Sequence, residues 1–283
     1  SAADRKVARG RADLWLPQGE WFDFFDGRRY VARGVDGRSI TAWRALDRMP
    51  VFARAGAIVP MQRLGEGSEV NSVANPLFPG ATGEFTMRED DGVYAHAVAG
   101  RTADTQLRWQ WHEGASGHAD ESTVFTVDPV CGDGADAAPQ SREWTITVRG
   151  VARPAPGPLE SCAHVTVGSK TVAVSPSDIA YDEAAMSLTL TVRDVPTRQQ
   201  MRVVFTDGLR IAQNPVEQDC YEILLHAQIQ FLTKEKALTA IREEGVHAIG
   251  SFAAINRGPR FDGDFLTAYL LESVVSALEE VLL

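Results

Sequence analysis

Two stretches near the N-terminus decide the fold: residues 14–30 read LWLPQGEWFDFFDGRRY, and residues 46–60 read LDRMPVFARAGAIVP. In the first, aromatic side chains surround a Pro17-Gln18-Gly19 turn, and in the second an apolar run follows Pro50. Short apolar runs bounded by Pro, Gly and Asp are typical of strands. With the connector between them, these stretches predict strands over 14–16, 20–25, 29–31, 39–43 and 51–52, and 56–59 continues the core.

The Asp26-Gly27 pair predicts a two-residue hairpin turn after the second strand, because both central positions of such a turn need a positive φ. Most of the aromatic side chains in 14–30 are expected to be core residues, since Trp and Phe bury large areas.

The region from 84 to 206 alternates apolar and polar residues in short runs separated by turn residues such as Asp91-Gly92 and Gly168-Ser169. This pattern predicts an antiparallel sandwich or barrel rather than βαβ units. The expected strands are 84–89, 93–98, 106–111, 123–127, 143–148, 164–167, 171–174, 186–192 and 201–205. The preceding stretch, 61–83, is rich in Gly, Ser, Asn and Pro and is predicted to be a linker or long loop.

After Pro215 the apolar period changes from 2 to 3.6, which predicts helices over 217–232, 234–244, 246–255 and 262–283. Gly245 is the expected C-cap of the second helix, and Asp262-Gly263-Asp264 is the expected N-terminus of the last one. The predicted fold class is therefore mostly β, an antiparallel β-sandwich followed by a small α-helical bundle. The predicted divisions are 1–62, a linker at 63–83, a sandwich at 84–210 and helices at 211–283.

The composition restricts the partners of this chain. The net charge is −10 and the pI is near 5.1, which argues against nucleic acid and against anionic membrane surfaces. Residues 211–283 hold 11 acidic and 5 basic side chains, so the helical tail is expected to be a separate segment. Three separated cysteines, Cys131, Cys162 and Cys220, favour reduced thiols in a cytoplasmic protein. No run of apolar residues is long enough to span a membrane, and residues 1–13 hold no apolar targeting segment.

Several motifs resemble glycoside hydrolase family 31, the retaining α-glucosidases, α-xylosidases and relatives. Residues 14–25 resemble the family's YLP-x-G-x-W-Y-D-F segment, and residues 50–60 resemble its P-V-F-x-R-x-G-x-I-x-P segment. Residues 85–94 resemble its F-x-L-Y-E-D-D-G…Y hairpin, with Met87-Arg88 in place of Leu-Tyr, and 105–111 fit its T-x-I-x-W strand. The resemblance covers residues 14–206 and implies the end of a proximal β-sandwich followed by a distal β-sandwich. The helical tail is not a general feature of the family.

The resemblance implies that catalysis lies outside this chain. Family 31 enzymes carry two catalytic aspartates on a barrel, and a retaining mechanism needs the carboxyl groups ~5–5.5 Å apart. The W-x-D-M-N-E nucleophile segment is absent from the sequence, and no alternation of strands and helices predicts a barrel. We therefore expect no catalytic residue, no cofactor and no glycoside hydrolysis by this chain alone. Its implied partner is the catalytic barrel of the same enzyme, and the implied substrate of that enzyme is an α-glycoside.

Other candidate sites are weaker than their structural alternatives. Glu89, Asp90 and Asp91 suggest acid/base chemistry or a cation, but Asp91-Gly92 favours a solvated turn. Two groups of side chains could suggest a metal site. Zinc-site spacing is absent from the first, which consists of His112, Glu113, His118 and Asp120. EF-hand spacing is absent from the second, which consists of Asp128, Asp133 and Asp136, so no metal site is predicted. Neither Cys131 nor Cys162 has a neighbouring pattern that would make it a nucleophile.

Sugar binding is the alternative function of a different class. Trp109 and Trp111 alternate on one strand and therefore share a face, which would stack on a glycan if it met solvent. The polar neighbours Arg108, Gln110 and His112 favour the opposite orientation, with both tryptophans in the core.

A third hypothesis is a protein-interaction module that acts through the acidic tail, residues 211–283. The proximal sandwich lacks partner strands, so we also expect an open edge and exposed aromatics such as Trp15 and Phe24. This predicts either self-association or disorder around residues 1–60.

Overall fold

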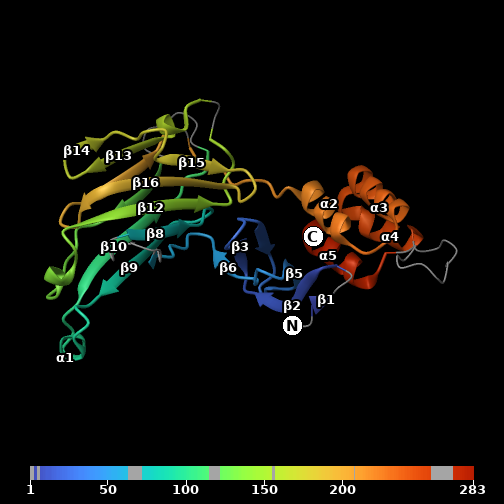
Figure 1. The fold of residues 1–283 in the computed structure, drawn as a ribbon, viewed down its shortest axis with the longest axis horizontal. Coiled ribbons are helices and arrows are strands. Elements are labelled where there is room, and N and C mark those ends of the chain that lie inside the picture. Colours follow the sequence, from blue (N-terminus) through green and yellow to red (C-terminus); the bar gives the residue numbers. More distant parts are fainter. Residues whose placement is uncertain are drawn as a thin grey trace. The chain divides into compact units, whose positions relative to one another are not determined.

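The computed structural model describes residues 3–4, 7–62, 72–114, 122–154, 157–206, 208–255 and 270–283. Its contacts divide the chain into two compact units. The first comprises Ser1–Gly19, Val31–Val51 and Asn214–Leu283, and the second comprises Glu20–Tyr30 and Phe52–Gln213. The fold is mostly β, with helices at the C-terminus, as the sequence predicts (Figure 1).

The second unit is built on a β-sandwich. One sheet has the order β14-β13-β17-β11-β10-β9 and the other has the order β15-β16-β12-β8-β7. The first sheet consists of β9 (Gly83–Glu89), β10 (Ala103–Gln110), β11 (Thr123–Val127), β13 (Ala163–Val167), β14 (Lys170–Val172) and β17 (Met201–Phe205). The second consists of β7 (Met61–Gln62), β8 (Ser72–Leu77), β12 (Ser141–Arg149), β15 (Ile179–Asp182) and β16 (Ser187–Pro196).

Alternation along the strands explains the core of the sandwich. Along β12 every second residue is buried, and the same period runs through β10, β16 and β17. Side chains at positions i and i+2 share a face of a strand, so each sheet turns one apolar row inward. The enclosed cluster includes Leu107, Trp109, Phe125, Trp144, Ile146, Leu188, Leu190, Met201, Val203 and Phe205.

The strand prediction missed β15, and it differs from the structure most in two other places. The expected linker at 63–83 contains β8, which pairs in parallel with β12 and buries Val73 and Leu77 in the core. The Asn and Pro residues of this segment favoured a loop in the prediction, although β8 pairs with β12 on one side and with β7 on the other. The expected strand at 93–98 is instead a short helix, α1 (Tyr94–Val98), in the connection between β9 and β10. None of its residues is buried, so no sheet contact favours the extended form.

The aromatic motif lies in and around a three-stranded sheet with the order β4-β3-β6: β3 (Gly19–Asp23), β4 (Arg29–Ala32) and β6 (Phe52–Arg54). Phe22 is fully buried and Phe24 packs on Phe78, with the ring centroids 5.9 Å apart. The turn is wider than the two residues predicted, since β3 ends at Asp23 and its carboxylate accepts the N–H of Phe25 at 2.9 Å.

Two close approaches hold that turn in place. Gly27 has φ +73° and Gly150 has φ +72°, and a Cβ on Gly27 would lie 2.6 Å from the Gly150 nitrogen. A Cβ on Gly150 would lie 2.6 Å from the Phe22 ring. Only glycine fits both conformations at this distance. Arg149 also donates to the Phe25 carbonyl oxygen at 2.8 Å.

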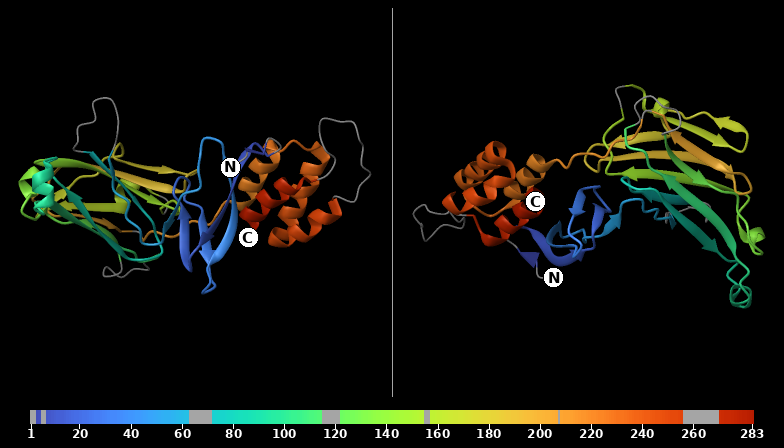
Figure 2. Two further views of the ribbon diagram at one scale, coloured as in Figure 1. Left: turned by 90° about the horizontal axis from the view of Figure 1, so that it is seen from below. Right: turned by 180° about the vertical axis from the view of Figure 1, so that it is seen from behind.

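The first unit joins a small sheet to the helical tail. The sheet has the order β1-β2-β5, with β1 (Ala3–Asp4), β2 (Arg9–Leu16) and β5 (Arg38–Ala45). The tail consists of α2 (Val216–His226), α3 (Phe231–Glu244), α4 (Ala248–Ile255) and α5 (Glu272–Leu282), which pack into a bundle (Figure 2). Among the described residues no helix is long and apolar enough to cross a membrane.

The predicted helices at 234–244 and 246–255 end at the same residues as α3 and α4, and two other boundaries are corrected. The expected helix at 217–232 is two helices, because the chain leaves the helical path at Ala227 and buries both Ala227 and Ile229. Gly245 ends α3 with φ +58°, as expected of a C-cap. The expected N-terminus at Asp262 lies outside the described residues, and α5 begins at Glu272.

Candidate functional site

The tail is fixed to the N-terminal sheet by a buried carboxylate on α5. Glu280 Oε1 accepts from Arg44 Nη1 at 2.6 Å, and its Oε2 accepts the Trp43 backbone N–H at 2.6 Å. The two charged side chains are 3% and 11% exposed. Trp43 Nε1 in turn donates to Ser276 Oγ at 3.2 Å. Because the Glu280 carboxylate is charged, its hydrogen bonds with Arg44 and with the Trp43 N–H are stronger than bonds between neutral groups.

This contact closes the edge of the sheet. β5 is the last strand in the order β1-β2-β5, and the N–H of Trp43 would otherwise be an unpaired edge donor. Glu280 also faces Arg9. Burial lowers the pKa of Arg9, and the negative charge of Glu280 offsets part of this decrease. Trp43 and Val7 belong to one apolar core with the helices, which includes Cys220, Ile223, Leu224, Ala237, Phe252, Val274 and Leu278.

The prediction of exposed aromatics holds for one residue and fails for the other. Trp15 is 57% exposed on β2. Phe24, by contrast, is only partly exposed, because it packs against Phe78. The helical tail, rather than missing strands, covers Trp43. Self-association of the chain stays a prediction.

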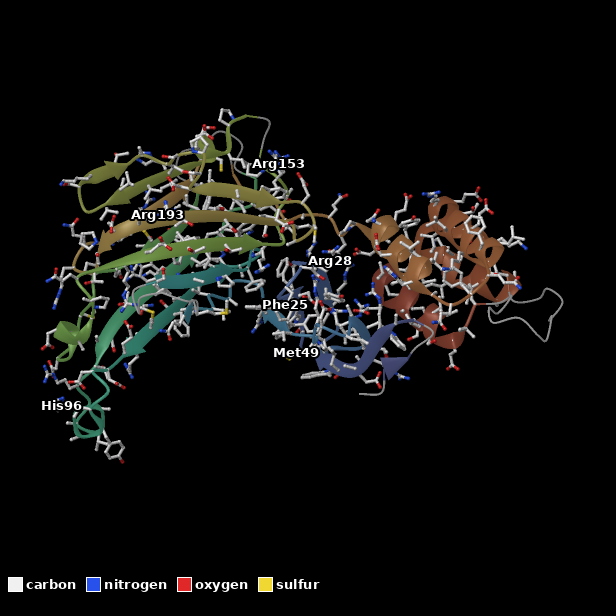
Figure 3. The ribbon with its side chains drawn as sticks, in the orientation of Figure 1. Phe25, Arg28, Met49, His96, Arg153 and Arg193 are labelled. Atoms are coloured by element: carbon white, nitrogen blue, oxygen red, sulfur yellow. The ribbon has the colours of Figure 1, made fainter. Side chains whose placement is uncertain are left out.

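The three adjacent carboxylates have separate structural roles. Glu89 binds Arg142 through both oxygens, at 2.7 and 2.6 Å, and the Arg142 side chain is 3% exposed. Asp90 accepts the N–H of Gly92 at 2.8 Å. Asp91 accepts the N–H of Val93 and contacts the ring of His96 at 2.7 Å. Asp90 and Asp91 thus shape the turn, as the Asp-Gly dipeptide predicts, and Figure 3 shows His96 in the projecting connection that follows it.

The structure places Trp109 in the core. Its side chain has no exposed surface, and its Nε1 donates to the Phe78 carbonyl oxygen at 3.0 Å. Trp111 is half-buried against the same core, with the two ring centroids 5.9 Å apart. Trp109 therefore offers no face to a glycan. This is the inward orientation that the polar neighbours of the two tryptophans predict.

Three of the suggested metal ligands, Asp128, Asp136 and Glu113, have other partners. Asp128 pairs with Arg108, and Asp136 pairs with Arg101 at 2.7 Å. Glu113 accepts the N–H of Ile211 at 3.3 Å. His118 and Asp120 lie outside the described residues. In the part of the chain that the structure describes, no three metal-binding side chains come together.

All three cysteines are free thiols. Cys131 is exposed, whereas Cys162 and Cys220 are buried. Burial in the tail core, with a smaller contribution from the charge of Asp219, raises the pKa of Cys220 to about 12. A thiol with so high a pKa is a poor nucleophile at neutral pH.

Sequence reasoning missed the site on β5. Arg44 and Glu280 are 236 residues apart, and neither stands in a motif. The one available signal was the position of Glu280 among the apolar residues of the last helix. The apolar period alone places this glutamate on the helix surface.

These features define a class: a β-rich, sandwich-containing region with a helical tail. Residues 5–59 match the family model described as "Glycosyl hydrolase family 31 C-terminal domain". The resemblance seen in the motifs is thus confirmed: residues 5–59 are similar to the C-terminal domain of family 31 glycoside hydrolases.

Curated relatives agree with this family. The chain is 28% identical over 101 residues to an alpha-xylosidase of Saccharolobus solfataricus, covering 34% of this chain and 13% of the relative. It is 36% identical over 86 residues to a 1,6-alpha-glucosyltransferase of Sporosarcina globispora, covering 29% of this chain and 6% of the relative. The chain therefore spans a small part of the curated relatives it matches.

A solved structure shows the same fold. The GH31 dextranase of Flavobacterium johnsoniae, complexed with glucose, aligns with a TM-score of 0.53 at 21% identity, covering 69% of this chain and 24% of the dextranase. At that identity the likeness concerns the fold alone.

Proposed function

We propose that this chain is the non-catalytic C-terminal part of a family 31 enzyme that cleaves O-glycosyl bonds of α-linked glucosides or xylosides. The observation that carries the proposal is the match of residues 5–59 to the family's C-terminal domain. The names of the curated relatives, an alpha-xylosidase and a 1,6-alpha-glucosyltransferase, favour an α-linked sugar as the substrate of the whole enzyme.

The role of these parts is to support the catalytic barrel of the same enzyme. The sandwich core and the tail core are both well filled with apolar side chains, as expected of scaffolding units. The catalytic carboxylates would reside on the barrel, and the enzyme would act in the cytoplasm.

The test compares three proteins: the present chain, the full reading frame that encodes it, and the full reading frame truncated before Ser1. We expect no hydrolysis of 4-nitrophenyl α-glucoside or α-xyloside by the chain alone and clear hydrolysis by the full protein. The truncated protein should be inactive or should unfold at a lower temperature. Hydrolysis by the purified chain alone would contradict the proposal, and so would a truncated protein as stable and active as the full one.

A second candidate function is self-association through the tail. The end of α2 and the start of α3 expose large apolar side chains: Leu225 at 49%, Phe231 at 75% and Leu232 at 63%. Lys234 Nζ donates to the Leu225 carbonyl oxygen at 2.8 Å, so the two helix ends lie together. Apolar side chains exposed together are typical of interaction surfaces.

Light scattering after gel filtration tests this candidate. We expect a mass above 30.8 kDa for the wild-type chain and a monomer for the Phe231→Ser, Leu232→Ser double variant. The matched control replaces the exposed Val35 with Ser, which should leave the mass unchanged. A wild-type monomer at high concentration would exclude this candidate.

A further inference from the structure

An exposed tryptophan on the first unit is held in one orientation. Trp15 Nε1 donates to the Asp36 carbonyl oxygen at 2.8 Å, while the side chain remains 57% exposed. The indole edge lies against Gly37, where a Cβ would stand 2.6 Å from Nε1. Gly37 has φ +75°, so glycine both allows this turn and leaves room for the ring. The ring is thus a fixed apolar surface that faces solvent.

Polar side chains continue the row beside this ring. Asp13 and Trp15 are alternate residues of β2 and share a face, at a spacing of about 6.6 Å along the strand. In the register with β5, Asp13 faces Thr41 and Trp15 faces Ser39. Thr41 Oγ1 donates to Asp13 Oδ1 at 2.8 Å. These side chains line a surface hollow of about 500 Å³.

The charge of this row is balanced. Arg11 donates to both oxygens of Asp13, through Nε at 3.2 Å and through Nη2 at 3.1 Å. The hydrogen bond from Thr41 and then those from Arg11 hold the pKa of Asp13 below its ordinary value, so the carboxylate is an ionised acceptor at neutral pH. A paired carboxylate and guanidinium give no net attraction to a cation, a phosphate or a charged peptide. They do offer planar donors and acceptors to a neutral ligand that carries many hydroxyls.

We propose that Trp15, Asp13 and Thr41 form a surface subsite for a pyranose unit of an α-linked oligosaccharide. The C–H face of the sugar ring stacks on the indole, and its edge hydroxyls bind the Asp13 carboxylate and the Thr41 and Ser39 hydroxyls. The fixed indole lowers the ordering cost of binding, since it is already held in the free protein. Contact with one or two rings on an open surface gives weak binding, with a Kd on the order of 1 mM. The subsite itself rests on geometry, while the α-linkage rests on the proposed function.

The experiment is ¹⁹F NMR of the full chain labelled with 5-fluorotryptophan. The chain has six tryptophans, and Trp15→Phe assigns the signal of Trp15. Maltotriose and isomaltotriose are titrated to about 20 mM, and cellotriose serves as the β-linked control. We expect a saturable shift of the Trp15 signal with an α-linked sugar and none with cellotriose. Asp13→Asn should weaken the binding about fivefold to tenfold, and Arg33→Gln, an exposed charge in the same unit, should leave it unchanged.

Three results would overturn the proposal. One is the absence of any Trp15 shift, or a shift confined to the signal of Trp111. Another is an equal response to cellotriose, which would remove the α-linked class. The third is a Trp15 shift that follows protein concentration without sugar, which would assign the surface to a second copy of the chain. Because the proposed function is tested by the activity of the full reading frame, the two can fail separately.

Discussion

Replacing Glu280 with Gln should release the helical tail from the N-terminal sheet. Glutamine keeps the shape and an oxygen acceptor for the Trp43 N–H, but it removes the charge that faces Arg44 and Arg9. The Glu280 and Arg44 side chains are 3% and 11% exposed, so the lost charge removes a close anionic partner from the Arg44 guanidinium in a buried position. Removing one partner of a buried pair costs about 3–5 kcal/mol, and the retained acceptor favours the lower end, about 3 kcal/mol.

The assay is native-state hydrogen exchange read by mass spectrometry. A loss of about 3 kcal/mol corresponds to roughly 100-fold faster exchange where opening controls the rate. We expect this acceleration in peptides from β5 and α5, because they share one core. Peptides from β12 should keep their rates, since they belong to the core of the sandwich.

Two variants serve as controls for this prediction. Glu243→Gln makes the same change of charge at an exposed position on α3 and should alter exchange by less than about threefold. Replacing both Arg44 and Glu280 with Met removes the Arg44 charge together with its partner and should recover part of the protection, because Arg9 and the Trp43 N–H still lose Glu280. Less than fivefold acceleration in Glu280→Gln would refute the reasoning, and so would an equal acceleration in β12.

Four further predictions concern other parts of the molecule. Gly150→Ala should destabilise the second unit by about 2–4 kcal/mol, seen as a lower denaturation midpoint, because its Cβ meets Phe22 at 2.6 Å; Gly157→Ala, in open space, should be neutral. Glu89→Gln should cost about 2–3 kcal/mol by the same measurement, since the carboxylate is partly exposed but its partner Arg142 is buried, whereas an unchanged midpoint would show that the pair contributes nothing. At pH 8 a thiol reagent should label one cysteine per native chain rapidly, and Cys131→Ser should abolish that phase; fast labelling of Cys220 would contradict its burial and raised pKa. Hydrogen bonds from Arg88 hold the pKa of Asp104 below its ordinary value of 3.8. The ionised Asp104 therefore stabilises the fold fully above pH 3.8, and this contribution is lost as the pH falls through the folded-state pKa. A carboxyl NMR titration should show the lowered pKa in the wild type and a pKa closer to the ordinary value in Arg88→Gln.

Period-2 patterns predicted most of the sandwich, because apolar alternation is imposed by burial on one face. The strands at 123–127 and 201–205 agree with the structure at both ends. Where burial does not follow alternation, prediction failed. Residues 72–77 carry Asn75 and Pro76, yet tertiary pairing on both sides makes them a strand. Residues 94–98 look apolar, yet with no sheet to join they form a helical turn.

The site features divide in the same way. The turn role of Asp90 and Asp91 was predictable, since Asp-Gly chemistry is local. The pairing of Glu89 with Arg142, and of Glu280 with Arg44, joins residues 53 and 236 positions apart, which no local pattern records. The exposure of Trp15 could be anticipated from an unpartnered sheet, but its fixed orientation depends on Gly37 and Asp36 in the following turn.

The most direct test of the central claim is the sequence of the reading frame immediately upstream of the Ser1 codon in the gene. If this chain is the post-barrel region of a family 31 enzyme, that sequence should encode alternating strands and helices with a W-x-D-M-N-E segment. An upstream sequence that encodes an unrelated domain would contradict the account.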